Sequence, residues 1–169
     1  RHAGWLAVHS GLASGADVIL YPEEKYNSKE VCDKIRKLKE QGQNTGIIVI
    51  AEGAEEKDGS YTTQDEKLDA FGHVKLGGAG EKLAKLIEDK TGIETRHIVL
   101  GHLARGGTPS AFDRVYGARL GYAAINLVLG KKWGQMLTLR GTDIKSMSLE
   151  DGVKQLKTVT NDYKDLIKQ

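Results

Sequence analysis

The sequence predicts an α/β protein with three layers, in which helices flank a parallel sheet. Two observations support this fold class. Short apolar runs, DVILYP at 17–22 and GIIVIAEG at 46–53, are typical of strands buried on both faces. Other segments, longer than these runs, carry apolar side chains at helical spacing. Strands that alternate with helices of this length indicate a parallel sheet with right-handed crossovers.

The first half of the chain adds two predicted helices to these strands. Residues 5–13 have helical spacing, and this helix is expected to stop at Gly15. Residues 28–42 are amphipathic, and Ser28 is placed to cap the helix that they form. The polar stretch at 54–72 is expected to form a long surface insertion.

A third helix and a third strand follow the insertion. Residues 77–92 are predicted to be helical, and Gly92 suits the left-handed position after the helix. The residues expected to face inward are Leu83, Leu86 and Ile87. The run ETRHIVLGH at 94–102 is predicted to be the third strand.

The longest predicted helix covers residues 111–129 and carries one apolar face. Ser110 followed by Asp113 resembles a capping box at its start. The remaining predicted elements are a fourth strand at 135–141 and short closing helices at 149–157 and 161–168.

The bulk composition fits one sizeable domain, because 39% of the 169 residues are hydrophobic. Charged residues make up 28% with both signs mixed, and the net charge is +2, so neither a nucleic-acid nor a membrane partner is predicted. No apolar run approaches about 18 residues, and no membrane-spanning segment is expected. The chain starts RHAGWLAV, without Met, and is interpreted as part of a longer protein.

The cysteine and histidine usage gives no sign of a metal site in this chain. Cys32 is the only cysteine, so no internal disulfide is possible and a cytoplasmic location is expected. The histidines show neither an H-x-x-x-H nor an H-E-x-x-H pattern. The segment GGAGEK at 77–82 lacks the G-x-x-x-x-G-K-[ST] spacing, so no nucleotide site is predicted there.

Ligands of open parallel α/β sheets bind beyond the carboxyl ends of the strands, which directs attention to three places. The strand at 46–50 ends in Ala51-Glu52-Gly53, and the strand at 17–21 ends in Pro22-Glu23-Glu24. The third strand ends in a loop with His102 and Arg105. An acid together with a His/Arg pair fits a sugar phosphate, because carboxylates accept from hydroxyls while arginine and imidazole donate to phosphate oxygens.

Each candidate residue has an alternative structural interpretation. Glu52 could merely cap a loop, and His102 could be a buried histidine with its hydrogen bonds satisfied. Arg105 favours anion binding, because the adjacent Gly106 and Gly107 let backbone N–H groups approach a ligand. Arg96, at the start of the third predicted strand, is by position a solvated surface charge.

Four motifs together resemble the carboxyl-terminal half of a bacterial-type 6-phosphofructokinase. They are RHAGWLA (1–7), AEG (51–53), ETRHIVLGHLARGGTPSAFDR (94–114) and LRGTDI (139–144). They occur in the order of the family's motifs over nearly the whole chain. The LRGTDI and LKTV (156–159) segments look most like the mixed-substrate group, whose members use either ATP or pyrophosphate.

The resemblance implies a role for five residues. His102 and Arg105 would bind the 6-phosphate of fructose 6-phosphate, and Glu52 would accept hydrogen bonds from the sugar hydroxyls. Arg1 matches the arginine of the family's M-G-R motif and would stabilise charge on the transferring phosphoryl group. Arg96 matches an arginine that reaches the 6-phosphate in a neighbouring subunit, which replaces the interpretation as a surface charge.

The resemblance also implies the reaction. The family transfers a phosphoryl group in line to the C1 hydroxyl of fructose 6-phosphate, giving fructose 1,6-bisphosphate in glycolysis, with Mg²⁺ and an aspartate base. The aspartate, the donor site and most of the Mg²⁺ site belong to the amino-terminal half. Residues 1–169 are therefore expected to be the acceptor-binding half, incompetent for catalysis alone, of a homodimer or homotetramer.

Departures from the family pattern leave alternatives open. Ala104 replaces a usual glutamine, with little effect expected. Gln41 and Gln43 stand where allosteric relatives carry lysines, which suggests an enzyme without effector regulation. A second hypothesis is a non-catalytic sugar-phosphate binding or regulatory module, and a third is a fragment without an independent role.

Overall fold

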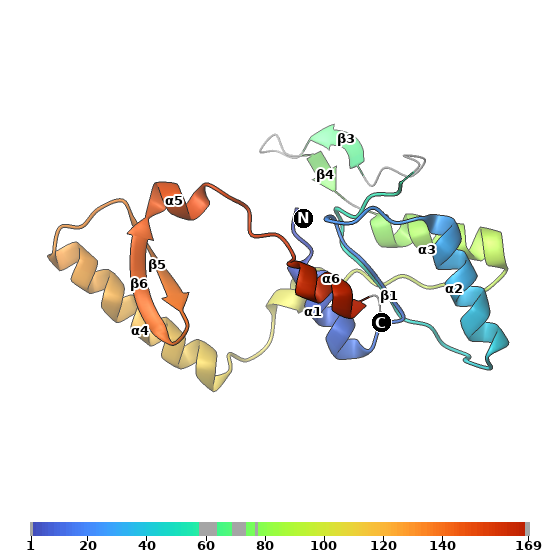
Figure 1. Cartoon of the computed structure of the whole chain (residues 1–169), viewed down its shortest axis with the longest axis horizontal. Coiled ribbons are helices and arrows are strands. Elements are labelled where there is room, and N and C mark those ends of the chain that lie inside the picture. Colours follow the sequence, from blue (N-terminus) through green and yellow to red (C-terminus); the bar gives the residue numbers. More distant parts are fainter. Residues whose placement is uncertain (1, 58–63, 69–73, 77, 168–169) are drawn as a thin grey trace. The chain divides into compact units, whose positions relative to one another are not determined.

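The structure is a computed structural model that describes residues 2–57, 64–68, 74–76 and 78–167 (Figure 1). In chain order its elements are α1 (Trp5–Ser14), β1 (Val18–Leu20), α2 (Ser28–Glu40), β2 (Ile48–Ile50), β3 (Gln64–Leu68), β4 (Val74–Leu76), α3 (Ala79–Thr91), the 3-10 helix η1 (Gly101–Arg105), α4 (Ala111–Leu129), β5 (Gln135–Arg140), β6 (Asp143–Ser148), α5 (Leu149–Val153) and α6 (Asn161–Ile167). The chain divides into two compact units. The first comprises Arg1–Val99 with Lys157–Gln169, and the second comprises Leu100–Leu156.

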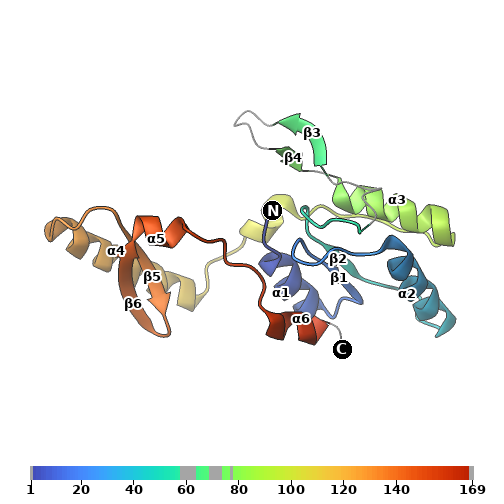
Figure 2. The same ribbon diagram turned by 45° about the horizontal axis from the view of Figure 1, so that its top comes forward.

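The first unit has the predicted three layers. Its central sheet is formed by β1 and β2, which pair in parallel with Ile19 opposite Val49. Because successive side chains of a strand point to opposite faces, Ile19 and Tyr21 pack toward α1 and α6, while Leu20 packs toward α2 and α3. Figures 1 and 2 show these two helix pairs on opposite sides of the strands. The α/β class and the parallel pairing are therefore confirmed.

Two hydrophobic cores hold these layers together. The core between the sheet and the α2–α3 layer contains Leu20, Val31, Cys32, Ile35, Ala54, Leu83, Leu86 and Ile87. The core on the other face contains Val8, Ile19, Tyr21 and Val159. The three α3 residues that were predicted to face inward are all buried. Ile87 is 1% exposed, and burial of such a side chain stabilises the folded state by about 1.5–3 kcal/mol.

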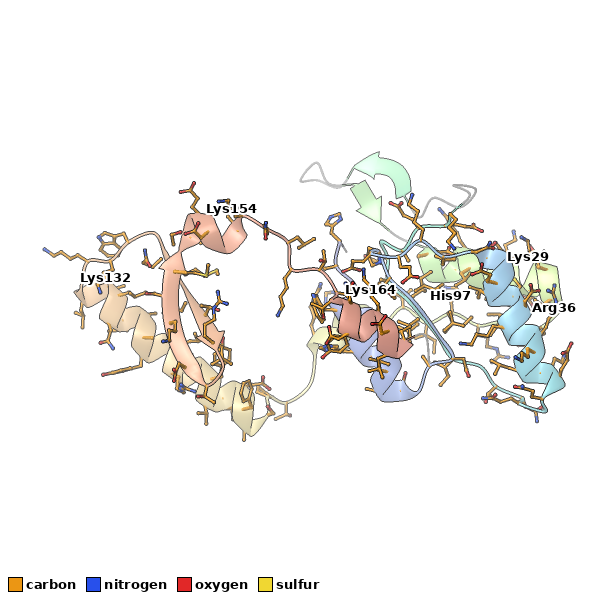
Figure 3. The ribbon with its side chains drawn as sticks, in the orientation of Figure 1. Lys29, Arg36, His97, Lys132, Lys154 and Lys164 are labelled. Carbon is orange, nitrogen blue, oxygen red and sulfur yellow. The ribbon has the colours of Figure 1, made fainter. Side chains whose placement is uncertain are left out.

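Polar contacts reinforce the packing of helices within each layer. Arg36 on α2, labelled in Figure 3, donates through Nη2 to the Lys90 carbonyl oxygen at the end of α3 at 2.6 Å. On the other face, the Trp5 indole of α1 donates to the Lys157 carbonyl oxygen at 2.7 Å. The Trp5 ring also meets Tyr163 of α6 edge to face, with ring centroids 5.4 Å apart. A hydrogen bond thus joins α2 to α3, whereas α1 meets α6 through an aromatic contact and bonds to the segment before it.

Three predicted helix boundaries are confirmed. Gly15 and Gly92 follow α1 and α3 in the left-handed conformation, with φ of 64° and 67°. The capping box at the start of α4 is complete, because the Ser110 hydroxyl accepts from the Asp113 N–H while the Asp113 carboxylate accepts from the Ser110 N–H. The hydrogen bonds from Ser110 hold the pKa of Asp113 below its usual value.

The predicted cap of α2 is wrong by one residue. Asn27 is the N-cap, and its Oδ1 accepts from the Lys29 N–H at 2.9 Å. Ser28 is already helical and buried, and its N–H donates to Glu56 Oε1 at 3.2 Å. Asn and Ser are both favoured at the N-cap, and Asn27 stands directly before Ser28.

The described part of the expected surface insertion contains a strand that the sequence pattern did not predict. β3 pairs antiparallel with β4, with Gln64 opposite Leu76 and an irregularity in the register. The sequence of β3, QDEKL, is mostly charged and has no alternation of apolar residues, so the usual strand signal is missing. Residues 58–63 and 69–73 of this region lie outside the described residues.

The predicted third strand is wrong. Residues 94–100 belong to no strand, and 101–105 form η1. Ile98 is 82% exposed and Val99 is 71% exposed, although the run is strongly apolar. A strand needs a hydrogen-bonded neighbour, and none of the strands that the structure describes pairs with these residues.

The second unit consists of η1, α4, the β5–β6 hairpin and α5. The predicted fourth strand is confirmed as β5, but it pairs antiparallel with β6, from Gln135 opposite Ser148 to Arg140 opposite Asp143. It therefore does not extend the parallel sheet. Gly141 makes the turn between the two strands, with φ of 61°. No helix in the described ranges is long and apolar enough to cross a membrane.

Candidate functional site

Glu52 lies at the tip of a tight turn directly after β2. The Ala51 N–H donates to the Leu20 carbonyl oxygen at 2.8 Å, which anchors the start of the turn to β1. The Ala54 N–H donates to the Ala51 carbonyl oxygen at 3.0 Å and closes it. The Glu52 side chain is exposed. Its carboxylate is therefore held by backbone geometry at the carboxyl end of the parallel sheet, where such sheets bind ligands.

The turn after β1 carries two more acids, and both have partners within the protein. Glu23 accepts from the backbone N–H groups of Gly4 and Val159 at 2.9–3.0 Å. Glu24 Oε2 accepts from the Tyr21 hydroxyl at 2.8 Å. Burial of the Tyr21 ring and this hydrogen bond raise the pKa of Tyr21 well above its usual value. The sequence pointed to this strand end, but not to these contacts.

His102 and Arg105 both lie in η1, in the second unit. A 3-10 helix has about three residues per turn, so residues three apart project from the same side. The turn is closed by the Leu103 N–H, which donates to the Leu100 carbonyl oxygen at 2.8 Å. Both side chains are exposed, which excludes the alternative that His102 is a buried core histidine. One short turn thus presents an imidazole and a guanidinium together.

Glycines set the conformation on both sides of η1. Gly101 and Gly107 have φ of 48° and 97°, in the region that glycine adopts far more readily than other residues. A Cβ on Gly106 would lie 3.5 Å from the His102 carbonyl oxygen. The predicted Gly-rich loop is therefore present, and its glycines allow the backbone to enter and leave the turn that carries His102 and Arg105.

Arg96 lies in the first unit and is exposed. Its Nε and Nη2 donate to Glu94 Oε1 at 2.9 and 2.7 Å, and this pairing raises the pKa of Arg96. The next residue, His97, is labelled in Figure 3, and its Cβ lies 3.8 Å from the position that a Cβ on Gly80 would occupy. The side chains of Arg96 and of its partner Glu94 are both exposed to solvent. Arg1 lies outside the described residues.

The structure thus brings His102 and Arg105 together in one turn and places Glu52 and Arg96 in the other unit. Within the described ranges, no three His, Cys, Asp or Glu side chains are grouped so that they could hold a metal ion. Glu52 follows a parallel strand, the place where α/β sheets bind ligands, and the His102–Arg105 turn offers hydrogen-bond donors to an anion.

The family within this class is shown by comparison with known proteins. Residues 1–128 match the family described as phosphofructokinase. The chain belongs to the phosphofructokinase family.

Curated relatives carry two names. The chain is 49% identical to pyrophosphate–fructose 6-phosphate 1-phosphotransferase of Streptomyces coelicolor over 94% of its length. It is 44% identical to ATP-dependent 6-phosphofructokinase of Mycobacterium leprae over the same share. In both cases it covers 46% of the relative, so the chain spans about half the length of the curated relatives it matches.

A solved structure supports the fold. Pyrophosphate-dependent phosphofructokinase from Marinobacter aquaeolei superimposes with a TM-score of 0.74 over 96% of this chain and 40% of its own. The two sequences are 24% identical, so this likeness bears on the fold alone. It confirms the predicted phosphofructokinase-like α/β architecture.

Proposed function

We propose that this chain is the fructose 6-phosphate-binding half of a 6-phosphofructokinase. The full-length protein would transfer a phosphoryl group from ATP or pyrophosphate to the C1 hydroxyl of fructose 6-phosphate, giving fructose 1,6-bisphosphate in glycolysis. The observation that carries the proposal is the turn that presents His102 and Arg105 together, in a chain closely related to enzymes named for this reaction.

The His102–Arg105 turn suits the 6-phosphate. The Arg105 guanidinium offers a planar fork of N–H donors that matches two phosphate oxygens, and the His102 imidazole supplies a further donor from the same side of η1. Both side chains are exposed, which supports this role because a ligand can reach them from solvent.

Glu52 suits the sugar. An ionised carboxylate only accepts hydrogen bonds, so it pairs with hydroxyls and repels phosphate. Its exposed position after β2 leaves its oxygens open to the sugar hydroxyls. The role proposed for Glu52 is therefore to accept hydrogen bonds from the sugar hydroxyls, and the role proposed for η1 is to bind phosphate.

Two further arginines complete the proposal. Arg1 would lie near the transferred phosphoryl group and stabilise the charge that develops there. Arg96 would bind the 6-phosphate in a neighbouring subunit, which makes the working enzyme a homodimer or homotetramer. To do so Arg96 must leave Glu94, and an exposed ion pair of this kind is easily exchanged for a phosphate.

We further propose that the reaction uses Mg²⁺, which bridges and neutralises phosphoryl oxygens in this chemistry. Its ligands would come mainly from the amino-terminal half of the enzyme. A cytoplasmic location fits both the substrate and the lone, buried Cys32.

Titration calorimetry of this chain with fructose 6-phosphate tests the site directly. Binding should be detectable for the wild-type chain and weaker for Arg105→Ala, with Arg114→Ala as the matched control. Arg114 suits this purpose because its Nε donates to the Pro109 carbonyl oxygen at 3.3 Å, a contact within the protein. Equal affinity of wild type and Arg105→Ala would contradict the assignment. Tighter binding of fructose 2,6-bisphosphate than of fructose 6-phosphate would favour a regulatory module instead.

A further inference from the structure

Tyr26 lies beyond the end of β1 and joins the loop after β1 to the loop after β2. Its N–H donates to the Glu55 carbonyl oxygen at 3.0 Å, and its carbonyl oxygen accepts from the Lys57 N–H at 2.8 Å. These two hydrogen bonds form a parallel bridge between Tyr26 and Glu56. All four residues belong to the first unit. One residue after β1 therefore holds the segment that follows Glu52.

The bridge continues the register of the parallel sheet. Every pair of β1 and β2 residues is 30 positions apart in sequence, and so is the bridge between Tyr26 and Glu56. The loop that carries Glu52 starts where the Ala51 N–H donates to the Leu20 carbonyl oxygen at 2.8 Å, and it ends at the bridge. Glu52 therefore lies in a short loop that is hydrogen-bonded to the same neighbouring segment at both ends.

The ring of Tyr26 fixes the bridge to the hydrophobic core. Tyr26 is half-buried and packs against the core that contains Leu20, Val31 and Cys32. Burial, together with the charge of Glu56, raises the pKa of Tyr26 to about 12, so the phenol is neutral at physiological pH. A neutral aromatic ring packs among apolar side chains without the cost of burying a charge. Tyr26 thus connects the core to the backbone of the Glu52 loop.

We infer that Tyr26 is a positioning residue for Glu52. Glu55, whose carbonyl oxygen accepts from Tyr26, follows Glu52 by three residues, so this anchor lies within about 10 Å of chain length. The Glu52 side chain is exposed, so its place depends on the backbone of its loop. A misplacement of about 1 Å weakens the contact of a group with its substrate, even when the cause is remote. The inference rests on the proposed function, in which Glu52 accepts hydrogen bonds from the sugar hydroxyls.

The test is the kinetics of Tyr26→Ala in the full-length protein. This variant removes the ring that fixes the bridge to the core, so the Glu52 loop should lose its second anchor. We expect the KM for fructose 6-phosphate to rise about three- to tenfold, with a smaller change in kcat. KM does not depend on the concentration of active enzyme, so partial unfolding of the variant cannot by itself raise it.

Two control variants separate positioning from a general loss of packing. Ile35→Ala removes a buried side chain from the same core, and its KM should equal that of wild type. Ile35 suits this purpose because its Cδ1 lies 3.4 Å from the position of a Cβ on Gly46, toward the opposite end of β2. Tyr26→Phe keeps the ring and both backbone hydrogen bonds, and should retain the wild-type KM. If Tyr26→Ala does not fold, Tyr26→Leu takes its place, with a smaller rise in KM expected.

A double-mutant cycle shows whether Tyr26 acts through Glu52. In a Glu52→Ala background, Tyr26→Ala should raise the KM no further, because the carboxylate that Tyr26 positions is already gone. A merely structural role would instead add its effect in both backgrounds.

Two failures can be told apart. If the wild-type full-length protein transfers no phosphoryl group, or Glu52→Ala leaves the KM unchanged, the proposed role of Glu52 fails and the role of Tyr26 fails with it. If Glu52→Ala raises the KM but the Tyr26 variant does not, or raises it equally in both backgrounds or no more than Ile35→Ala, then only the positioning inference is overturned.

Discussion

Acidic residues follow both strands of the parallel sheet, and their surroundings differ. Glu23, after β1, accepts three hydrogen bonds from backbone N–H groups and is half-buried. Glu52, after β2, is exposed at the tip of a turn. The same place in the fold therefore holds one acid occupied by the chain itself and one that is open to a ligand.

This difference teaches that position at a strand end does not by itself make a ligand-binding residue. Glu23 stabilises the chain, because two buried segments would lose their acceptor without it. Glu52 is exposed and is left for the sugar-binding role that we propose for it. The same distinction separates Arg114, bonded to the Pro109 carbonyl oxygen, from the exposed Arg105 in η1.

The largest expected effect concerns Arg105, one of the exposed residues proposed to bind the ligand. Arg105→Ala in the full-length protein should raise the KM for fructose 6-phosphate about 10- to 100-fold, because a charge-assisted phosphate contact is lost. Arg114→Ala should leave the KM unchanged. Steady-state kinetics at several fructose 6-phosphate concentrations measures both, and similar KM values for the two variants would break the distinction.

The next effect concerns the contact between Gly4 and the Glu23 carboxylate. Gly4→Ala forces a Cβ against Tyr21 and Glu23, and should lower the free energy of unfolding by about 1–3 kcal/mol. Urea unfolding of this chain measures the change. Gly117→Ala is the control, because a Cβ there meets no atom within 4 Å and alanine favours the helix. A loss confined to Gly117→Ala would contradict the contact at Gly4.

A smaller effect sharpens the contrast between the two acids. Glu52→Gln should raise the KM for fructose 6-phosphate about tenfold, through weaker acceptance from the sugar hydroxyls. Its free energy of unfolding should stay within about 0.5 kcal/mol of wild type, as for a surface substitution. Glu23→Gln should show a clear loss of stability in the same urea experiment, and equal stabilities would remove the difference between them.

The smallest expected effect concerns Arg96. Its pair with Glu94 is exposed, so Glu94→Gln should leave the urea midpoint of this chain unchanged. Arg96→Ala should weaken fructose 6-phosphate binding only in an assembled oligomer. Calorimetry on samples whose oligomeric state is known from ultracentrifugation checks this, and an equal loss in a monomer would show that Arg96 acts within its own chain.

Local features of the fold were predictable from the sequence. The left-handed glycines at 15 and 92, the capping box at Ser110 and the inward face of α3 all depend on neighbours a few residues away. The strand at 94–102 was not, because an apolar run says nothing about which strand lies beside it. β6 was missed because DIKSMS lacks an alternating apolar pattern.

The candidate site shows the same limit. His102 and Arg105 were identifiable because they share one loop with Gly106 and Gly107, although their common 3-10 turn was not. The role of Glu23 was out of reach, since its partners are 19 and 136 residues away. Sequence patterns indicate local chemistry. Whether the oxygens of a carboxylate already accept hydrogen bonds within the protein depends on contacts that only the folded chain creates.

The measurement that tests the central claim most directly is product formation by the full-length protein. Fructose 6-phosphate and Mg²⁺ are supplied with ATP or with pyrophosphate, and fructose 1,6-bisphosphate is quantified. The account predicts the bisphosphate with at least one donor, and a sharp loss at limiting fructose 6-phosphate in Arg105→Ala. No product with either donor, from a folded protein, would contradict it.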